Sequence, residues 1–83
     1  MRRRDRILID MKPLGVLLRE WRELVKLTPS EAARRCGISP QLWWQLENGE
    51  TLSPRAATLY KIAAGTGIPL ERLGAAVWAA TGA

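Results

Sequence analysis

Residues 28–49 read TPSEAARRCGISPQLWWQLENG, and this stretch contains two starts and two stops for short helices. Thr28 and Ser39 each offer a side-chain hydroxyl that can cap a helix, and each precedes a proline, which suits the first helical position. Gly37 and Gly49 each follow about two helical turns, where glycine readily takes the left-handed backbone that ends a helix. The stretch is therefore divided into two short helical segments by its own local signals.

Glu31 strengthens the first start, because it stands three residues after Thr28 and completes a capping box. We therefore predict helices over residues 29–36 and 40–47. Two short helices joined by a turn of about three to four residues that contains glycine form a helix-turn-helix. The second helix of such a unit can lie in the major groove of DNA, so the spacing indicates nucleic-acid recognition.

The rest of the sequence predicts three further helices and no strand. Apolar residues at helical spacing run over about 13–26, from Ser53-Pro54 to about Ala64, and over about 69–80. We therefore expect an all-α, five-helix bundle that occupies residues 13–83. The apolar stripe predicted for its first helix consists of Leu14, Leu17, Leu18, Trp21, Leu24 and Val25.

Residues 1–12 read as a basic arm in front of this domain. Its arginines are Arg2, Arg3, Arg4 and Arg6. Three interpretations stay open for the arm: a solvated chain start, a segment that reaches phosphates or the minor groove, and a short strand that pairs with a partner chain.

The composition excludes several classes of protein. The 83 residues include one cysteine and no histidine, which rules out a disulfide within the chain and argues against a Cys/His metal site. We expect the lone Cys36 to be a small buried apolar residue. No apolar run reaches the roughly 18 residues of a membrane span, and residues 7–9 are too short for a signal-peptide core. We expect a cytoplasmic protein.

The charge suits a nucleic-acid partner, but it is unevenly distributed. The net charge is +5, and residues 1–26 carry eight Lys or Arg against four Asp or Glu. Residues 27–83 carry five against four, so the predicted helix-turn-helix is almost neutral. Attraction to phosphate would come mainly from the front of the chain.

Several segments together resemble the Cro/repressor-type (XRE) helix-turn-helix family, with lambdoid phage repressors as the nearest likeness. These segments are Leu27–Ala33, Gly37–Ser39, Leu46–Gly49, Pro54 and Ile62–Ala63. The resemblance spans about residues 14 to 73. It implies a lambda-repressor-like bundle that binds operator DNA, usually as a symmetric dimer. It also implies that Arg22 pairs with Glu47 and locks the first helix onto the third, as a structural contact.

The resemblance places Trp43 in the core, which leaves Gln41, Trp44 and Gln45 as the candidate base-contact residues. Glutamine can pair with the N6 and N7 edge of adenine. Trp44 departs from the usual polar pattern, and three interpretations stay open: contact with a thymine methyl or sugar, an anchor for a protein partner, or packing over a neighbouring loop. Leu42 is expected largely at the surface and adds to the apolar character.

Two further sets of residues are assigned by position. The candidate phosphate contacts lie at helix starts and in the turn after the second helix of the helix-turn-helix: Thr28, Ser30, Ser39, Asn48, Thr51 and Arg55. The carboxylate of Glu50, in the same turn, would repel phosphate. The last helix carries Leu73, Val77 and Trp78, which are expected either to form a homodimer seam or to cover the core.

The sequence favours a DNA-binding transcriptional regulator that acts as a repressor in the family's manner, without cofactor or metal. An enzyme is not expected, because there is no histidine, glycine-rich phosphate loop or pair of carboxylates in a pocket. One alternative is an antitoxin that represses its own operon. The other is a protein-interaction module that uses the same bundle through Trp44 or the last helix.

Overall fold

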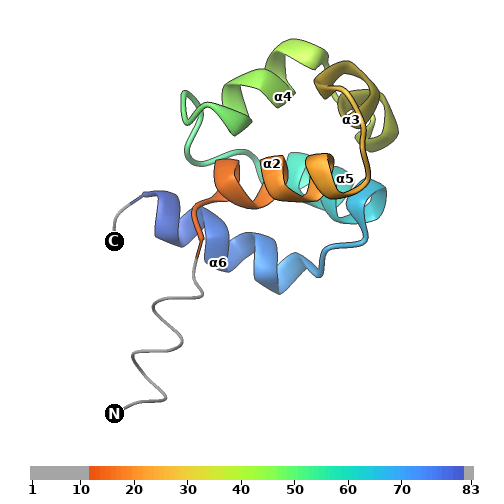
Figure 1. The fold of residues 1–83 in the computed structure, drawn as a ribbon. Coiled ribbons are helices and arrows are strands. Elements are labelled where there is room, and N and C mark those ends of the chain that lie inside the picture. Colours follow the sequence, from red (N-terminus) through yellow and green to blue (C-terminus); the bar gives the residue numbers. More distant parts are fainter. Residues whose placement is uncertain (1–11, 82–83) are drawn as a thin grey trace.

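The computed structural model describes residues 12–81, and within them the chain forms five helices and no strand (Figure 1). The helices are α2 (Leu14–Leu24), α3 (Pro29–Cys36), α4 (Pro40–Glu47), α5 (Ala56–Thr66) and α6 (Leu70–Ala80). The predicted all-α, five-helix architecture is therefore confirmed. The arginines of the predicted arm, Arg2, Arg3, Arg4 and Arg6, lie outside the described residues.

Both helices of the helix-turn-helix start where their capping residues predict. Thr28 Oγ1 accepts the Glu31 N–H at 3.2 Å, and Glu31 Oε1 accepts the Thr28 N–H at 2.8 Å, which closes the capping box. Ser39 Oγ accepts the Leu42 N–H at 3.0 Å. Gly37 ends α3 with a φ of 71°, which glycine adopts without a steric penalty. The turn is thus fixed by its own residues.

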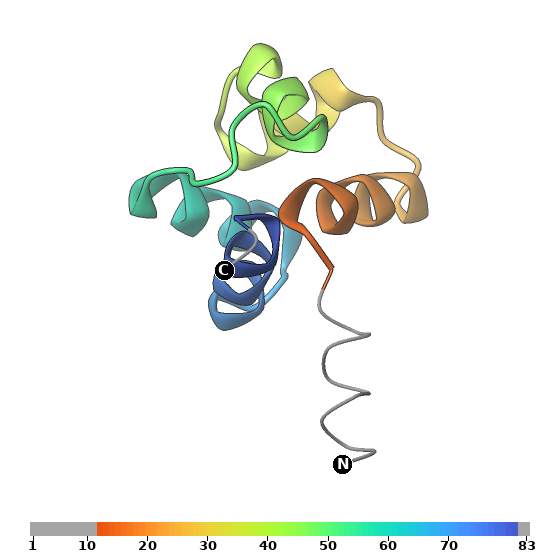
Figure 2. The ribbon, with the colours of Figure 1, turned by 90° about the vertical axis from the view of Figure 1, so that its left-hand side faces the viewer.

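The core lies among all five helices, with α2 and α5 packed between the α3–α4 pair and α6. In both views α3 and α4 lie at one end of the molecule and α6 at the other, with α2 and α5 between them (Figures 1 and 2). Trp43 of α4 is the largest fully buried side chain, and the ring of Trp21 from α2 lies 6.1 Å from it between centroids. The core residues are Leu14, Leu17, Leu18, Ala32, Ala33, Cys36, Trp43, Leu46, Ile62, Leu73 and Ala76.

The end of α2 differs from the prediction. The helix ends at Leu24, and the chain turns away at Lys26, whose φ is 60°. Leu24 was expected in the apolar stripe, but it is 80% exposed. Helical spacing identifies the side of a helix that faces the core, but it does not show how far the neighbouring helices extend. The last turn of α2 lies at the edge of the bundle, so the assignment of Leu24 to the core is wrong.

The start of α5 also differs. The pair Ser53-Pro54 predicted it, but α5 begins at Ala56, with Arg55 at the N-cap and no side-chain cap hydrogen bond. Residues 48–55 are needed as a loop that carries the chain from the end of α4 to the start of α5 (Figure 2). The capping signal at Ser53 is therefore overridden by the path of the chain. Gly67, with a φ of 79°, closes the helix.

Gly15 lets the first turn of α2 lie against the last turn of α4. A Cβ at this position would stand 2.6 Å from Glu47 O and 2.7 Å from Leu46 O, backbone atoms that move only if α4 moves. A Cβ at Gly74, in α6, would have no neighbour within 4 Å.

We expect opposite effects from alanine at these two glycines. Gly15→Ala should destabilise the fold by about 1–3 kcal/mol through overpacking. Gly74→Ala should stabilise it by about 0.5–1 kcal/mol, because alanine loses less conformational entropy than glycine in a helix. Urea unfolding of the two variants measures both effects. A stabilising Gly15→Ala would show that α2 and α4 do not approach this closely.

Candidate nucleic-acid interface

The helix α4 turns one side to the core and the other to solvent. Trp43 and Leu46 are buried, whereas Gln41 and Trp44 are exposed and Gln45 is partly exposed. Consecutive residues on a helix point about 100° apart, so the two tryptophans cannot share a side. We call Gln41, Trp44 and Gln45 the outward face of α4. Trp44 is 50% exposed, so a large aromatic surface lies beside the Gln41 amide.

A buried carboxylate fixes how α4 sits on α2. Glu47, the last residue of α4, has a side chain that is only 5% exposed. Arg22 donates to it twice, from Nε to Oε2 at 2.6 Å and from Nη2 to Oε1 at 3.0 Å. Trp43 Nε1–H also donates to this carboxylate, and Arg19 Nε lies 3.4 Å from Oε1. This is the ion pair that the family resemblance implied.

Arg22 connects more than two helices. Its Nη1 donates to the carbonyl of Leu27 at 3.1 Å, just before α3 begins. One guanidinium therefore joins α2, α4 and the segment that leads into the helix-turn-helix. Because α4 carries the outward face, this cluster orients the residues that would meet a ligand.

The charges of this cluster support one another. Burial would raise the pKa of the Glu47 carboxyl, but hydrogen bonds from Arg22 and Trp43, together with the charge of Arg22, outweigh burial and lower the pKa. The hydrogen bond to Glu47 is the main reason that the pKa of Arg22 is raised. The pKa of Glu31 is lowered by its hydrogen bonds with the backbone and side chain of Thr28.

We expect the fold to lose stability in acid through these two carboxyl groups. Their pKa values lie below the usual 4.5, so each stabilises the fold above that pH, and this stabilisation is lost as the pH falls through the folded-state pKa. Urea unfolding from about pH 7 to about pH 3 should show the loss. The stability gap between the native chain and Glu47→Gln should narrow over the same range. A gap that is constant with pH would contradict an ionised, hydrogen-bonded Glu47.

The candidate phosphate contacts at helix ends are available to a ligand in different degrees. Thr28 and Ser30 begin α3 and are exposed, but the Glu31 carboxylate already accepts the Thr28 N–H, so an anion there would meet a negative charge. Ser39 begins α4 and is exposed. Asn48, at the other end of α4, is exposed and donates its Nδ2–H to the carbonyl of Trp44 at 2.8 Å. Ser39, at the start of α4, is therefore the strongest candidate of the four.

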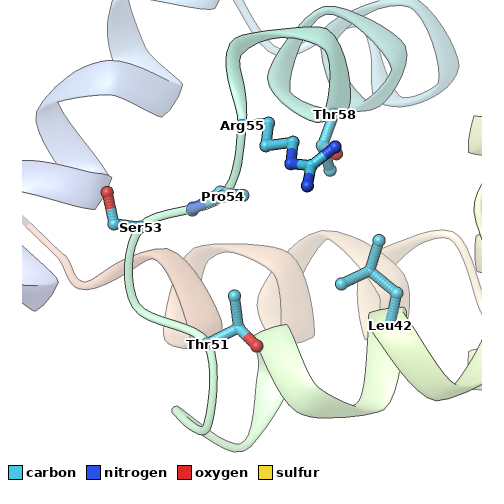
Figure 3. A pocket seen from close by; sticks show the side chains of 6 residues that line it. All are labelled: Leu42, Thr51, Ser53, Pro54, Arg55 and Thr58. Carbon is cyan, nitrogen blue, oxygen red and sulfur yellow. The ribbon is translucent and has the colours of Figure 1, made fainter.

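An open pocket lies between α4 and the start of α5 (Figure 3). Its lining residues are Leu42, Thr51, Ser53, Pro54, Arg55 and Thr58. The Arg55 guanidinium lies beside Thr58, and Leu42 extends from α4 toward this space (Figure 3). Two predicted phosphate contacts, Thr51 and Arg55, thus lie on one pocket next to the outward face.

The pocket also contains features that the sequence did not predict. Ser53 and Thr58 add hydroxyl groups, and their place becomes clear only from the path of residues 48–55. Leu42 was expected largely at the surface, but it is partly buried and packs against the core. The loop that returns from α4 covers this side of the helix, so that expectation is corrected.

The three residues of the predicted dimer seam on α6 differ in how exposed they are. Leu73 is 0% exposed, so it cannot contact a partner and its assignment to the seam is wrong. The reason is that α6 turns its Leu73 and Ala76 side toward α2 and α5. Val77 is partly buried against the core, whereas Trp78 is 55% exposed. Trp78 and the edge of Val77 are the parts of the predicted seam that a partner could reach.

Comparison with known proteins places the chain in a family. Residues 13–76 match the family model described as a helix-turn-helix domain. The chain belongs to this helix-turn-helix family. It is also 42% identical over 66 residues to an uncharacterised HTH-type transcriptional regulator, RghRB, of Bacillus subtilis (strain 168). That match covers 80% of this chain and 48% of the relative, so the chain spans about half the relative's length. No solved structure matches the chain significantly.

The family membership agrees with the resemblance found in the sequence, and the matched residues include both α3 and α4. Within residues 12–81, no helix is both long and apolar enough to cross a membrane.

Proposed function

We propose that this chain binds double-stranded DNA in a sequence-specific manner and regulates transcription, with α4 entering the major groove. The observation that carries the proposal is the outward face of α4, which is exposed while the opposite side of the same helix is anchored by Trp43 and Glu47. A helix held in one orientation can present the same side chains to each base pair that it meets. The Bacillus subtilis relative is named as a transcriptional regulator, which supports the same function.

In this proposal the residues divide into two roles. Gln41 and Gln45 read base edges, with Trp44 beside them. Contacts that position the protein on the backbone come from exposed residues at helix ends and from the pocket after α4: Thr28, Ser30, Ser39, Asn48, Thr51 and Arg55. Backbone contacts set the register of the protein on DNA and carry little sequence information. Occupancy of a promoter or operator would then repress transcription.

The proposal includes a homodimer. The C-terminal end of α6 and the loop of residues 48–55 lie on the same side of the molecule, the side that faces the viewer in Figure 2. A two-fold axis on this side would use Trp78 and the edge of Val77 and would bring both copies of α4 to one surface. Half-sites would then lie about 34–36 Å apart on DNA. The mass of the free protein and of its DNA complex tests this arrangement.

Selection from random duplex DNA at moderate salt, followed by titration with salt, tests the function. We expect recovery of a near-palindromic motif. The affinity should fall steeply as the salt concentration rises, because binding releases counterions from the DNA. The logarithm of the association constant should fall with the logarithm of the salt concentration, with a slope of about 0.9 for each phosphate neutralised. A protein that binds no duplex even at low ionic strength would contradict the proposal.

A second candidate function is a protein-interaction module. Trp44 and Trp78 are 50% and 55% exposed, and α4 carries no lysine or arginine. Exposed tryptophan is typical of residues that dominate protein interfaces. A hydrophobic interface would change little in affinity with salt, so the titration that tests DNA binding also separates these two functions.

A further inference from the structure

The outward face of α4 contains an unusual set of chemical groups for a helix that enters a groove. Pro40–Glu47 includes one charged residue, Glu47, and Arg22 holds that carboxylate where its side chain is 5% exposed. The outward face therefore offers two amides and one indole, with no cation and no free carboxylate. A ligand that binds this face must therefore offer hydrogen-bonding partners for the two amides and an apolar group for the indole.

The major groove presents each base pair with a distinct chemistry. Guanine is typically read by arginine or lysine, and the cytosine amino group by a carboxylate, neither of which the outward face offers. Adenine is read by the amide of asparagine or glutamine, and thymine alone presents a methyl group. An A·T pair therefore displays both an edge that suits glutamine and an apolar group that suits indole.

We propose that Trp44 packs against a thymine 5-methyl group, and that the half-site is built on A·T pairs read by Gln41 and Gln45. This inference rests on the proposed function. Trp44 is three residues after Gln41, so the indole is a neighbour of that amide, and Gln41 lies between Trp44 and Gln45 around the helix. Half of the Trp44 surface is free for the contact.

Thymine-to-deoxyuridine replacement tests this contact, because it removes one methyl group and leaves base pairing unchanged. The probe is the duplex recovered by selection from random DNA, with each thymine replaced in turn. We expect one position in each half-site at which the replacement weakens binding about fourfold, the effect of exposing one buried methyl-sized group. Trp44→Ala should bind the thymine and deoxyuridine duplexes equally.

Tyr60→Ala is the matched control, because Tyr60 is a 61% exposed aromatic residue on α5. This variant should keep the fourfold thymine preference of the native chain. The inference is overturned if no thymine position responds to deoxyuridine, if the recovered half-site lacks A·T pairs, or if Trp44→Ala keeps the preference. In each of these outcomes the protein still binds DNA, so they are distinct from failure of the proposed function, in which no duplex is bound. If Trp44 anchored a protein partner instead, the native chain would bind the thymine and deoxyuridine duplexes with equal affinity.

Discussion

Replacing Glu47 with alanine is expected to destabilise the fold by about 3–5 kcal/mol, because it leaves the largely covered guanidinium of Arg22 without its ionic partner. The side chain of Arg22 is 17% exposed, and the change removes both of its hydrogen bonds to α4. It also removes the acceptor for Trp43 Nε1. Small domains are stable by only about 5–15 kcal/mol. The variant should therefore unfold at a much lower urea concentration, as followed by circular dichroism.

The ion pair between Lys12 and Glu20 provides the control. It is as short as the Arg22–Glu47 pair, at 2.7 Å against 2.6 Å, but its side chains are 43% and 50% exposed. Glu20→Ala should change stability by less than about 1 kcal/mol, because an exposed pair gains little over solvated charges. If Glu47→Ala and Glu20→Ala changed the free energy of unfolding by similar amounts, the buried ion pair of Glu47 would add nothing to stability. In that case α4 would be held by its apolar contacts alone.

The helix-turn-helix was predictable from sequence because its signals are local. The Thr28 and Ser39 caps and the Gly37 stop each involve atoms within a few residues, and all three form as predicted. The division of the two tryptophans is also local, since helix geometry separates neighbours by about 100°. That the side with Trp43 faces inward came from the family resemblance, and burial of Trp43 agrees with it.

The remaining features depend on contacts between distant segments. Leu24 and Leu73 both lie on apolar stripes, yet one is 80% exposed and the other fully buried, because the neighbouring helices cover only one of them. Ser53 has the sequence of a helix cap but lies in the loop before α5. The pocket lined by Leu42 of α4 and by Arg55 and Thr58 exists because that loop returns alongside α4. A single sequence carries no direct signal for these arrangements.

Alanine at both Gln41 and Gln45 is expected to relax the sequence preference of DNA binding while the fold stays intact. A glutamine that pairs with adenine contributes about 1–3 kcal/mol of discrimination, or about tenfold to a hundredfold at its base pair. Gln41 is exposed, so its truncation removes no core packing. The structural role of Gln45 lies in its main-chain oxygen, which accepts the N–H of Glu50 at 2.8 Å and is kept in alanine. Binding to matched and mismatched duplexes measures the loss.

Arg55→Ala separates base reading from backbone binding. A residue that contacts phosphate should weaken binding to all duplexes by a similar factor and reduce the salt slope by about one. The double glutamine variant should instead lower affinity for the matched duplex toward that of the mismatched one, with the salt slope kept. Because Arg55 and the outward face come from neighbouring elements, these two responses should be separable within a single interface. If the glutamine variant weakened both duplexes equally, α4 would touch DNA without reading it.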